Sequence, residues 1–289
     1  MKRFISAFLA FILCFSASAV GFAETVDVSF SPDEQTEDSS SSPLSYVVLG
    51  DSIARGAGLW NPEEAVYGKI VADTDGFEYH NFGIDGFRSV DLAALLHRKD
   101  VAETVKNADI ISISIGGNDF LRGNLPRLIL STLVGNRGPL NEIIDNFYLN
   151  FCTVIEEIKV LNPDAVILTQ TLYNTGGYII FYPVFEIALR QFNDCFYRYQ
   201  RENPDSIEIV DIYSAFRFKG INICGDTIHP NSSGNKIIAR EILKKLNELG
   251  LGDKTEPVIN AEPVTTISVN PVNFVYLIIL LLNKTAAVT

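Results

Sequence analysis

The chain has 289 residues, of which 47% are hydrophobic and 20% are charged, and its formal net charge at pH 7 is -12. This length and composition are enough for one sizeable core, so one main globular domain is expected. The excess of acidic groups repels polyanions, which argues against a nucleic-acid-binding protein.

Residues 1–23 have the order of a secretory signal peptide, with two basic residues, an apolar run from Phe4 to Phe15 and then small residues. Cleavage is expected after Ala23 or, alternatively, after Ala19. The rival interpretation is an uncleaved membrane anchor, which the short apolar run disfavours. The sequence therefore predicts a protein that is secreted or held at the cell surface.

Residues 24–43 are acidic and rich in serine, with few apolar side chains to offset the entropy of ordering. They predict a flexible linker ahead of the main domain, residues 44–252. The acidic side chains within the linker are interpreted as a solvated charge run rather than as a calcium site.

Short apolar runs alternate with helical patterns through the main domain. Five strands are predicted, at residues 46–49, 77–82, 110–115, 165–168 and 207–210; the second of them is mixed in composition and ends at Gly83. The intervening patterns predict helices near 62–71, 89–106, 140–158, 188–199 and 238–249. Strands that are apolar on both faces are typical of parallel sheets covered by helices. The alternation indicates an α/β fold.

The first strand ends in Gly50-Asp51-Ser52, which places a serine one step beyond the strand. Open parallel α/β sheets bind ligands beyond the carboxyl ends of their strands, so Ser52 is a candidate nucleophile. Residue 54 is alanine, so the last glycine of the G-x-S-x-G elbow is missing and an ordinary α/β-hydrolase is disfavoured. Taken alone, Gly-Asp-Ser is more often a turn than an active site.

Two further motifs follow the second and third strands. Residues 81–86 read Asn-Phe-Gly-Ile-Asp-Gly, with Gly83 at the end of the strand, and Gly116-Gly117-Asn118-Asp119 comes directly after the third strand. The paired glycines let the backbone approach a ligand, and the Asn118 amide can donate to a developing oxyanion. Each motif by itself would be an ordinary turn.

Asp226 and His229 lie three positions apart in a loop that continues into Pro-Asn. In such a loop the carboxylate can accept a hydrogen bond from the imidazole Nδ1–H while Nε2 points away. The other two histidines are His80, within a predicted strand, and His97, after a helical pair of leucines. Ser52, Asp226 and His229 are therefore a candidate triad, in the chain order common among α/β hydrolases.

Together the four motifs resemble, in order, the sequence blocks of the SGNH, or GDSL, hydrolases, over roughly residues 46–250. The resemblance implies a three-layer α/β/α sandwich with a central parallel sheet of about five strands in flavodoxin-like order. It also implies a serine esterase or lipase that needs no metal or other cofactor. By this resemblance the catalytic residues are Ser52, Asp226 and His229, and the oxyanion hole is formed by Ser52, Gly83 and Asn118.

The implied function is hydrolysis of a small-molecule, lipid or carbohydrate ester through an acyl-enzyme. Two alternatives stay open: a carbohydrate or cell-wall O-deacetylase with the same triad, and a non-catalytic surface-binding module on the same fold. Apolar residues follow Asn118 and the fourth strand. If they line the cleft, longer acyl chains should be preferred; the other interpretation is that they cover the core, with Leu125, Leu128 and Ile129 on one helix face.

Three cysteines remain after the leader, Cys152, Cys195 and Cys224, so at least one is unpaired within a monomer. At most one internal disulfide is expected, with Cys195–Cys224 the suggested pairing.

Residues 253–289 form a C-terminal extension whose apolar run, 272–282, is too short for an ordinary membrane span. An added strand, an interfacial anchor and part of a surface-attachment signal are the roles left open for it. The oligomeric state is likewise open.

Overall fold

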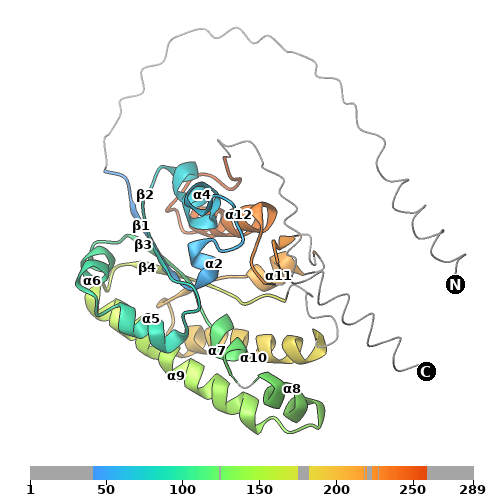
Figure 1. Cartoon of the computed structure of the whole chain (residues 1–289). Coiled ribbons are helices and arrows are strands. Elements are labelled where there is room, and N and C mark those ends of the chain that lie inside the picture. Colours follow the sequence, from blue (N-terminus) through green and yellow to red (C-terminus); the bar gives the residue numbers. More distant parts are fainter. Residues whose placement is uncertain are drawn as a thin grey trace, which may run out of the picture. The chain divides into compact units, whose positions relative to one another are not determined.

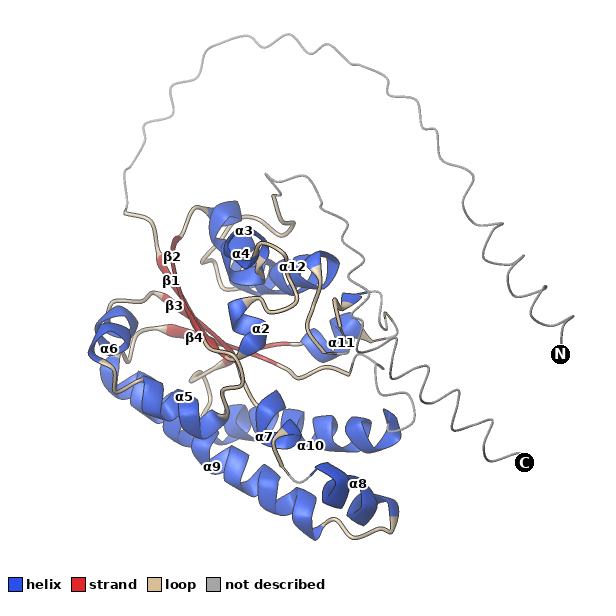
Figure 2. Ribbon diagram, in the orientation of Figure 1, coloured by secondary structure: helices blue, strands red, loops and turns tan. Residues whose placement is uncertain are grey.

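The computed structural model of the protein describes residues 42–123, 125–174, 182–217, 219, 223–226 and 228–258. The leader, most of the linker and the apolar run of the extension lie outside the described residues, so the expectations about them stay predictions. A five-stranded parallel sheet lies at the centre, with helices on both of its faces (Figure 1, Figure 2). Its strand order is β2-β1-β3-β4-β5, the flavodoxin-like order, which confirms the predicted fold class.

The five strands match the five predicted runs to within two residues at either end. They are β1 (Ser45–Gly50), β2 (Glu78–Gly83), β3 (Ile110–Ser114), β4 (Val166–Gln170) and β5 (Glu208–Val210). Gly50 pairs with Gly83 on one side and with Ser114 on the other, so the first three strands end level with one another. Because all pairs are parallel, the segments that follow the strands leave from one edge of the sheet.

One face of the sheet is covered by α5 (Ser89–Leu95), α6 (Lys99–Lys106), α9 (Gly138–Leu161) and α10 (Tyr182–Glu202). Val47, Leu49 and Ile113 point into this side and belong to the larger of two hydrophobic clusters. The predicted helix over 89–106 is in fact two helices, because the backbone of Arg98 adopts an extended conformation just before α6 begins.

The other face is covered by α2 (Ser52–Arg55), α4 (Tyr67–Asp75), α11 (Ile212–Phe216) and α12 (Ser232–Glu248). The alternate residues of β1, Tyr46 and Val48, belong to the second hydrophobic cluster, which also contains Ile238 and Ile242 of α12. The predicted helix over 62–71 is interrupted at Val66, which is extended and separates α3 (Pro62–Ala65) from α4. Two further short helices, α7 (Gly117–Leu121) and α8 (Leu125–Leu133), follow β3.

Aromatic rings fill the core between α9 and α10. Phe147 lies 4.9 Å from Phe192, 5.6 Å from Phe196 and 6.0 Å from Phe151 between ring centroids, and its side chain is fully buried. The pairs with Phe196, Phe192 and Phe151 are edge-on, tilted and stacked, respectively, and such ring pairs add to the stabilisation that burial alone supplies.

The three cysteines of the main domain, Cys152, Cys195 and Cys224, are all free thiols. Cys195 packs in the cluster with α9 and α10, whereas Cys224 packs in the cluster with α12. The sheet separates the last two, so the suggested Cys195–Cys224 disulfide is wrong.

Phe147→Ala should lower the free energy of unfolding by about 3–5 kcal/mol, because it leaves a cavity among aromatic rings that cannot collapse around it. Leu149→Ala, two residues along the same helix at a side chain that is 64% exposed, is the control and should stay within about 0.5 kcal/mol of the parent. Urea unfolding followed by circular dichroism measures both. Equal losses in the two variants would contradict the packing described for α9.

Candidate active site

Ser52 is the first residue of α2, immediately beyond the end of β1. The preceding residue fixes this geometry: the Asp51 N–H donates to Ser114 O at 3.1 Å, and Asp51 Oδ1 accepts from the Ile53 N–H at 2.9 Å. Asp51 therefore caps the helix, a use for which its residue type is well suited. The Ser52 N–H is one of the helix's first amides, which have no partner inside the helix.

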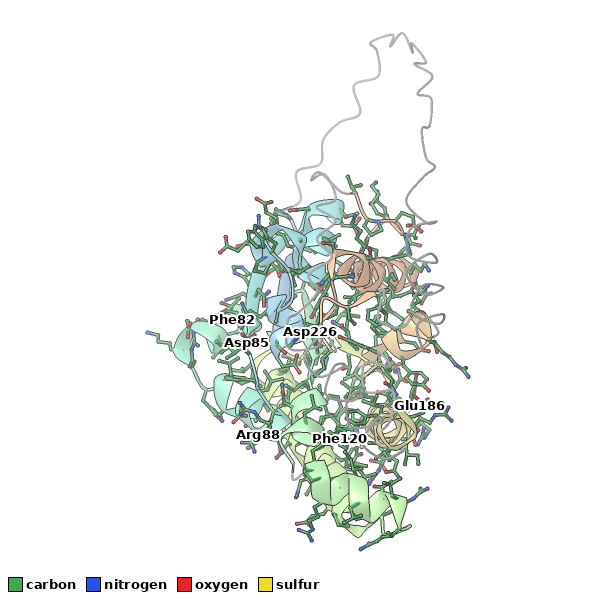
Figure 3. The ribbon with its side chains drawn as sticks, turned by 45° about the vertical axis from the view of Figure 1, so that its right-hand side comes forward. Phe82, Asp85, Arg88, Phe120, Glu186 and Asp226 are labelled. Atoms are coloured by element: carbon green, nitrogen blue, oxygen red, sulfur yellow. The ribbon has the colours of Figure 1, made fainter. Side chains whose placement is uncertain are left out.

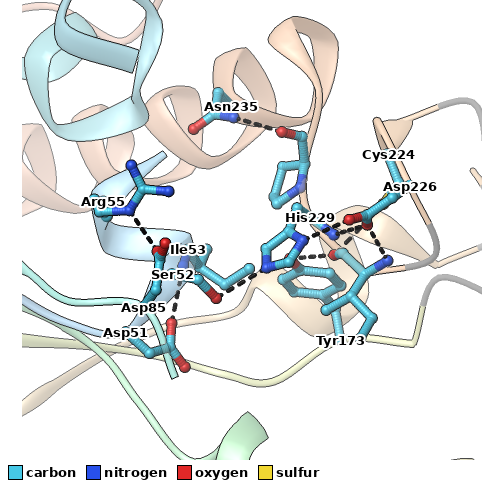
Figure 4. Close-up of polar contacts among 12 residues, drawn as sticks. Asp51, Ser52, Ile53, Arg55, Asp85, Tyr173, Cys224, Asp226, His229 and Asn235 are labelled. Carbon is cyan, nitrogen blue, oxygen red and sulfur yellow. Dashed lines mark hydrogen bonds and ion pairs between the residues drawn. The ribbon is translucent and has the colours of Figure 1, made fainter. Parts of the chain in front are cut away.

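Ser52, His229 and Asp226 meet, although 177 residues separate the serine from the histidine (Figure 4). His229 Nε2 lies 2.9 Å from Ser52 Oγ, and His229 Nδ1 lies 2.7 Å from Asp226 Oδ2. The carboxylate is an acceptor, so Nδ1 carries the proton and Nε2 is left to accept from the serine hydroxyl. The structure thus brings all three residues of the candidate triad into one hydrogen-bonded chain.

The charged forms of Asp226 and His229 stabilise each other. Burial alone would raise the pKa of Asp226, but hydrogen bonds from the His229 ring and from the backbone N–H groups of Ile228 and His229 outweigh it and lower that pKa to about 2. The hydrogen bond to Asp226 raises the pKa of His229 above its ordinary 6.5, against the opposing effect of burial. Asp226 therefore stabilises the imidazolium that forms when His229 takes up a proton.

The loop that holds Asp226 and His229 is tied to itself and to its neighbours. The Gly225 N–H donates to His229 O at 2.8 Å, and Cys224 and Pro230 form an isolated antiparallel β-bridge through their backbones. The two ends of the loop therefore lie side by side. The Tyr173 hydroxyl after β4 donates to Ile228 O at 3.1 Å. These bonds fix the height and direction of the imidazole over Ser52.

Asn118, the first-turn residue of α7, lines the same cleft as Ser52. Its Nδ2 donates to Phe87 O at 3.0 Å, which uses one of the two N–H groups of the amide and leaves the other for a ligand. Asp119 accepts from the N–H of Ser89 at 3.0 Å and from its hydroxyl at 2.5 Å. This pair joins the start of α7 to the start of α5, so the amide of Asn118 is held in place from both sides.

Gly83 lies at the end of β2 as expected, but its N–H donates to Asn81 Oδ1 at 2.8 Å. Asn81 in turn donates from Nδ2 to Ala54 O at 2.8 Å, joining β2 to α2. An oxyanion role for the Gly83 N–H would require the first of these bonds to break. Three residues on, Gly86 has φ 76°, and its N–H has no hydrogen-bond partner within the described residues.

The cleft beside Ser52 has a volume of about 160 Å³ and mostly apolar walls. Phe120, which is labelled in Figure 3, is one of the residues that line it. Phe120 of α7 lies 5.1 Å from Phe185 of α10 between ring centroids, and together they form one wall. The remaining apolar lining comes from Leu121, Leu172, Tyr173, Leu189 and Ile228.

The apolar residues after Asn118 thus divide between the two expected roles. Phe120 and Leu121 line the cleft, but Leu128 is 2% exposed and belongs to the core, with Leu125 and Ile129 packed partly against it. Most of the second apolar loop, residues 175–181, lies outside the described residues.

A sequence model of the GDSL-like lipase/acylhydrolase family matches residues 48–237, about two thirds of the chain. The chain belongs to this family. The matched residues include the candidate triad and all five strands except the start of β1, and the members of the family are ester-hydrolysing enzymes.

Within the GDSL family the chain is similar to the spore germination lipase LipC of Bacillus licheniformis, with 26% identity over 72% of this chain and 97% of LipC. Among solved structures it is similar to the lipase Lip_vut3 from a goat rumen metagenome, with 23% identity, a TM-score of 0.57 and coverage of 72% and 98% of the two chains. The acetyl-xylooligosaccharide esterase Axe2 of Geobacillus has the same fold, with 22% identity, a TM-score of 0.53 and coverage of 77% and 97%.

Asp51 was not predicted from the sequence to be a functional residue, but its carboxyl is buried next to Ser52. Burial raises its pKa to about 7, although its hydrogen bond from the Ile53 N–H acts in the opposite direction. The folded protein therefore holds this proton more tightly than the unfolded chain does. Its contribution to stability is fully present below the ordinary pKa of 3.8 and is lost as the pH rises through about 7.

Asp51→Asn should keep the cap, because an amide oxygen can accept from the Ile53 N–H, while removing the titration. The melting temperature of the variant relative to the parent should therefore increase between pH 4.5 and pH 8, where the parent must hold a buried carboxylate. Each unit of raised pKa corresponds to about 1.4 kcal/mol. Calorimetry at both pH values measures the difference; a gap that stays constant with pH would contradict the raised pKa.

Proposed function

We propose that this chain is a secreted serine esterase that hydrolyses carboxylic esters through an acyl-enzyme on Ser52. The observation that carries the proposal is the hydrogen-bonded chain from Ser52 Oγ through His229 to Asp226. A nucleophile within reach of a base, which is itself oriented by a third group, is the arrangement that activates a hydroxyl. The hydroxyl also opens onto a cleft that can hold an acyl chain.

In the first step His229 Nε2 takes the Ser52 proton as Oγ attacks the acyl carbon. The imidazolium, stabilised by Asp226, then gives that proton to the leaving alcohol oxygen as the ester bond breaks. In the second step a water molecule loses a proton to the same nitrogen and attacks the acyl-serine. The proton returns to Oγ as the acid leaves, so the enzyme is regenerated.

The negative charge that develops on the acyl oxygen needs donors already in place. We assign two of them to the Ser52 N–H and to the second N–H of the Asn118 amide. The turn after β2 supplies the third. Gly86 is the better candidate there, because the Gly83 N–H is already hydrogen-bonded to Asn81.

Export is part of the proposal and is supported by the signal-like residues 1–23. Within the described residues, no helix is both long enough and apolar enough to span a membrane.

Ser52→Ala and His229→Ala should each abolish nearly all turnover of a p-nitrophenyl ester by the full-length protein. Asn118→Ala should lower kcat by about 10²–10³, the usual cost of one oxyanion donor. The third donor is a backbone N–H, which a side-chain substitution does not remove. A Ser52→Ala protein with parental turnover would overturn the mechanism, whereas a parent protein inactive on all esters would favour a non-catalytic surface-binding module.

Higher kcat/KM is expected for butyrate to octanoate esters than for acetate, because each methylene buried on the cleft wall contributes about 0.8 kcal/mol. Leu189→Ala removes part of that wall, so its penalty should grow with acyl length. Leu128→Ala is the matched control: the leucine is buried away from the cleft, so the variant should lose thermal stability and affect all esters alike. A steady decline from acetate upward would instead favour an O-deacetylase, the activity in the name of Axe2.

A further inference from the structure

Helix α8 carries apolar side chains on both its inner and its outer side. Leu128 on the inner side is 2% exposed, whereas Leu130, Leu133 and Val134 on the other side are 64%, 65% and 73% exposed. With the exposed Pro126 these last three residues form what we call the outer face of α8, since the positions 126, 130, 133 and 134 follow helical spacing. A surface helix ordinarily turns a polar face to solvent, so this face suits an apolar partner.

Single exposed apolar residues are normal and need no partner. Trp60, Leu149 and Val160 are such residues, because each lies on a different segment or several turns from the next. The outer face of α8 differs in that neighbouring side chains form one continuous strip.

The charge around this strip is opposite to that of the whole chain. Between Asp119 and Glu142 the sequence has three arginines and no acidic residue, in a chain whose net charge is -12. Arg127 is exposed in the first turn of α8, and Arg137 is exposed just after its end. An apolar strip with cationic groups at both ends matches an anionic lipid surface, which offers hydrocarbon beneath a layer of negative headgroups.

The helix that carries the strip also packs against an element of the candidate active site. Phe120 and Leu121 of α7 line the cleft, and α8 begins four residues after Leu121. Helix α8 packs against α9 and α10 (Figure 1). Helix α10 supplies Phe185 and Leu189 to the same cleft.

We propose that the outer face of α8 docks on the surface of an anionic lipid bilayer, with its leucines among the upper acyl chains and the flanking arginines at the phosphates. The inference goes beyond ester hydrolysis, since docking needs no turnover. A second copy of the chain is a poorer occupant, because two such faces would bring like-charged arginines together.

The test uses the single tryptophan of the chain, Trp60. In the full-length protein, Trp60→Phe combined with Leu133→Trp places the only indole on the outer face of α8. The matched control, Trp60→Phe with Leu149→Trp, places it on α9 at nearly the same exposure, 64% against 65%. Each protein is mixed with vesicles of phosphatidylglycerol or of phosphatidylcholine, with and without brominated acyl chains.

With phosphatidylglycerol vesicles, the indole at position 133 should shift to the blue and be quenched by the brominated chains, while the indole at position 149 should do neither. Phosphatidylcholine should give a weaker response. Adding Arg127→Gln and Arg137→Gln to the protein that carries Leu133→Trp should weaken its binding to phosphatidylglycerol vesicles by about 25-fold, because each arginine contributes about fivefold.

Three outcomes would overturn the proposal. Equal quenching at the two positions would mean that another segment holds the protein on the vesicle, and no quenching at either would mean that no docking occurs. A blue shift that depends on protein concentration without vesicles would mean that a second copy covers α8. Turnover of a soluble acetate ester, measured on the same samples, keeps a failure of docking distinct from a failure of the proposed esterase.

Discussion

The close approach of the ends of β1 and β3 is the constraint on which the site depends. A Cβ atom at Gly50, where φ is 147°, would lie 2.1 Å from Ser114 O, so only glycine permits this pairing. The bond from the Asp51 N–H to the same Ser114 oxygen then ends the strand and starts α2. As a result Ser52 and Asn118, which follow two different strands, face one cleft.

Two acids near the imidazole carry opposite pKa shifts, and the difference follows from their partners. Asp226 has three hydrogen-bond donors in the loop, including the ring of His229, so its charge is compensated and its pKa falls to about 2. Asp51 is 4% exposed and accepts from one backbone N–H, so burial raises its pKa to about 7. The site therefore keeps a permanent negative charge on the side of His229 that faces away from Ser52.

The sequence was sufficient for the fold class and the strand positions. The central strands β1, β3 and β4 are short, mostly apolar runs, whereas β2, at the edge of the sheet, mixes polar and aromatic residues and could be placed by the glycine that ends it. The triad was also predictable, since each of its members adjoins a motif. Local patterns could not show that the chain breaks its helix at Val66, or that Asn81 takes up the Gly83 N–H. Both depend on tertiary contacts, as does the division of Phe120 and Leu128 between cleft and core.

The free cysteines on opposite faces of the sheet bear on the chemical durability of the protein. Burial raises the pKa of Cys195 and of Cys224 to about 12, and it raises that of Cys152 as well. Only the thiolate attacks disulfides and reacts readily with oxidants, and at neutral pH these side chains hold almost none of it. These thiols can therefore persist in oxidising surroundings, because packing rather than cross-linking keeps their sulfur unreactive.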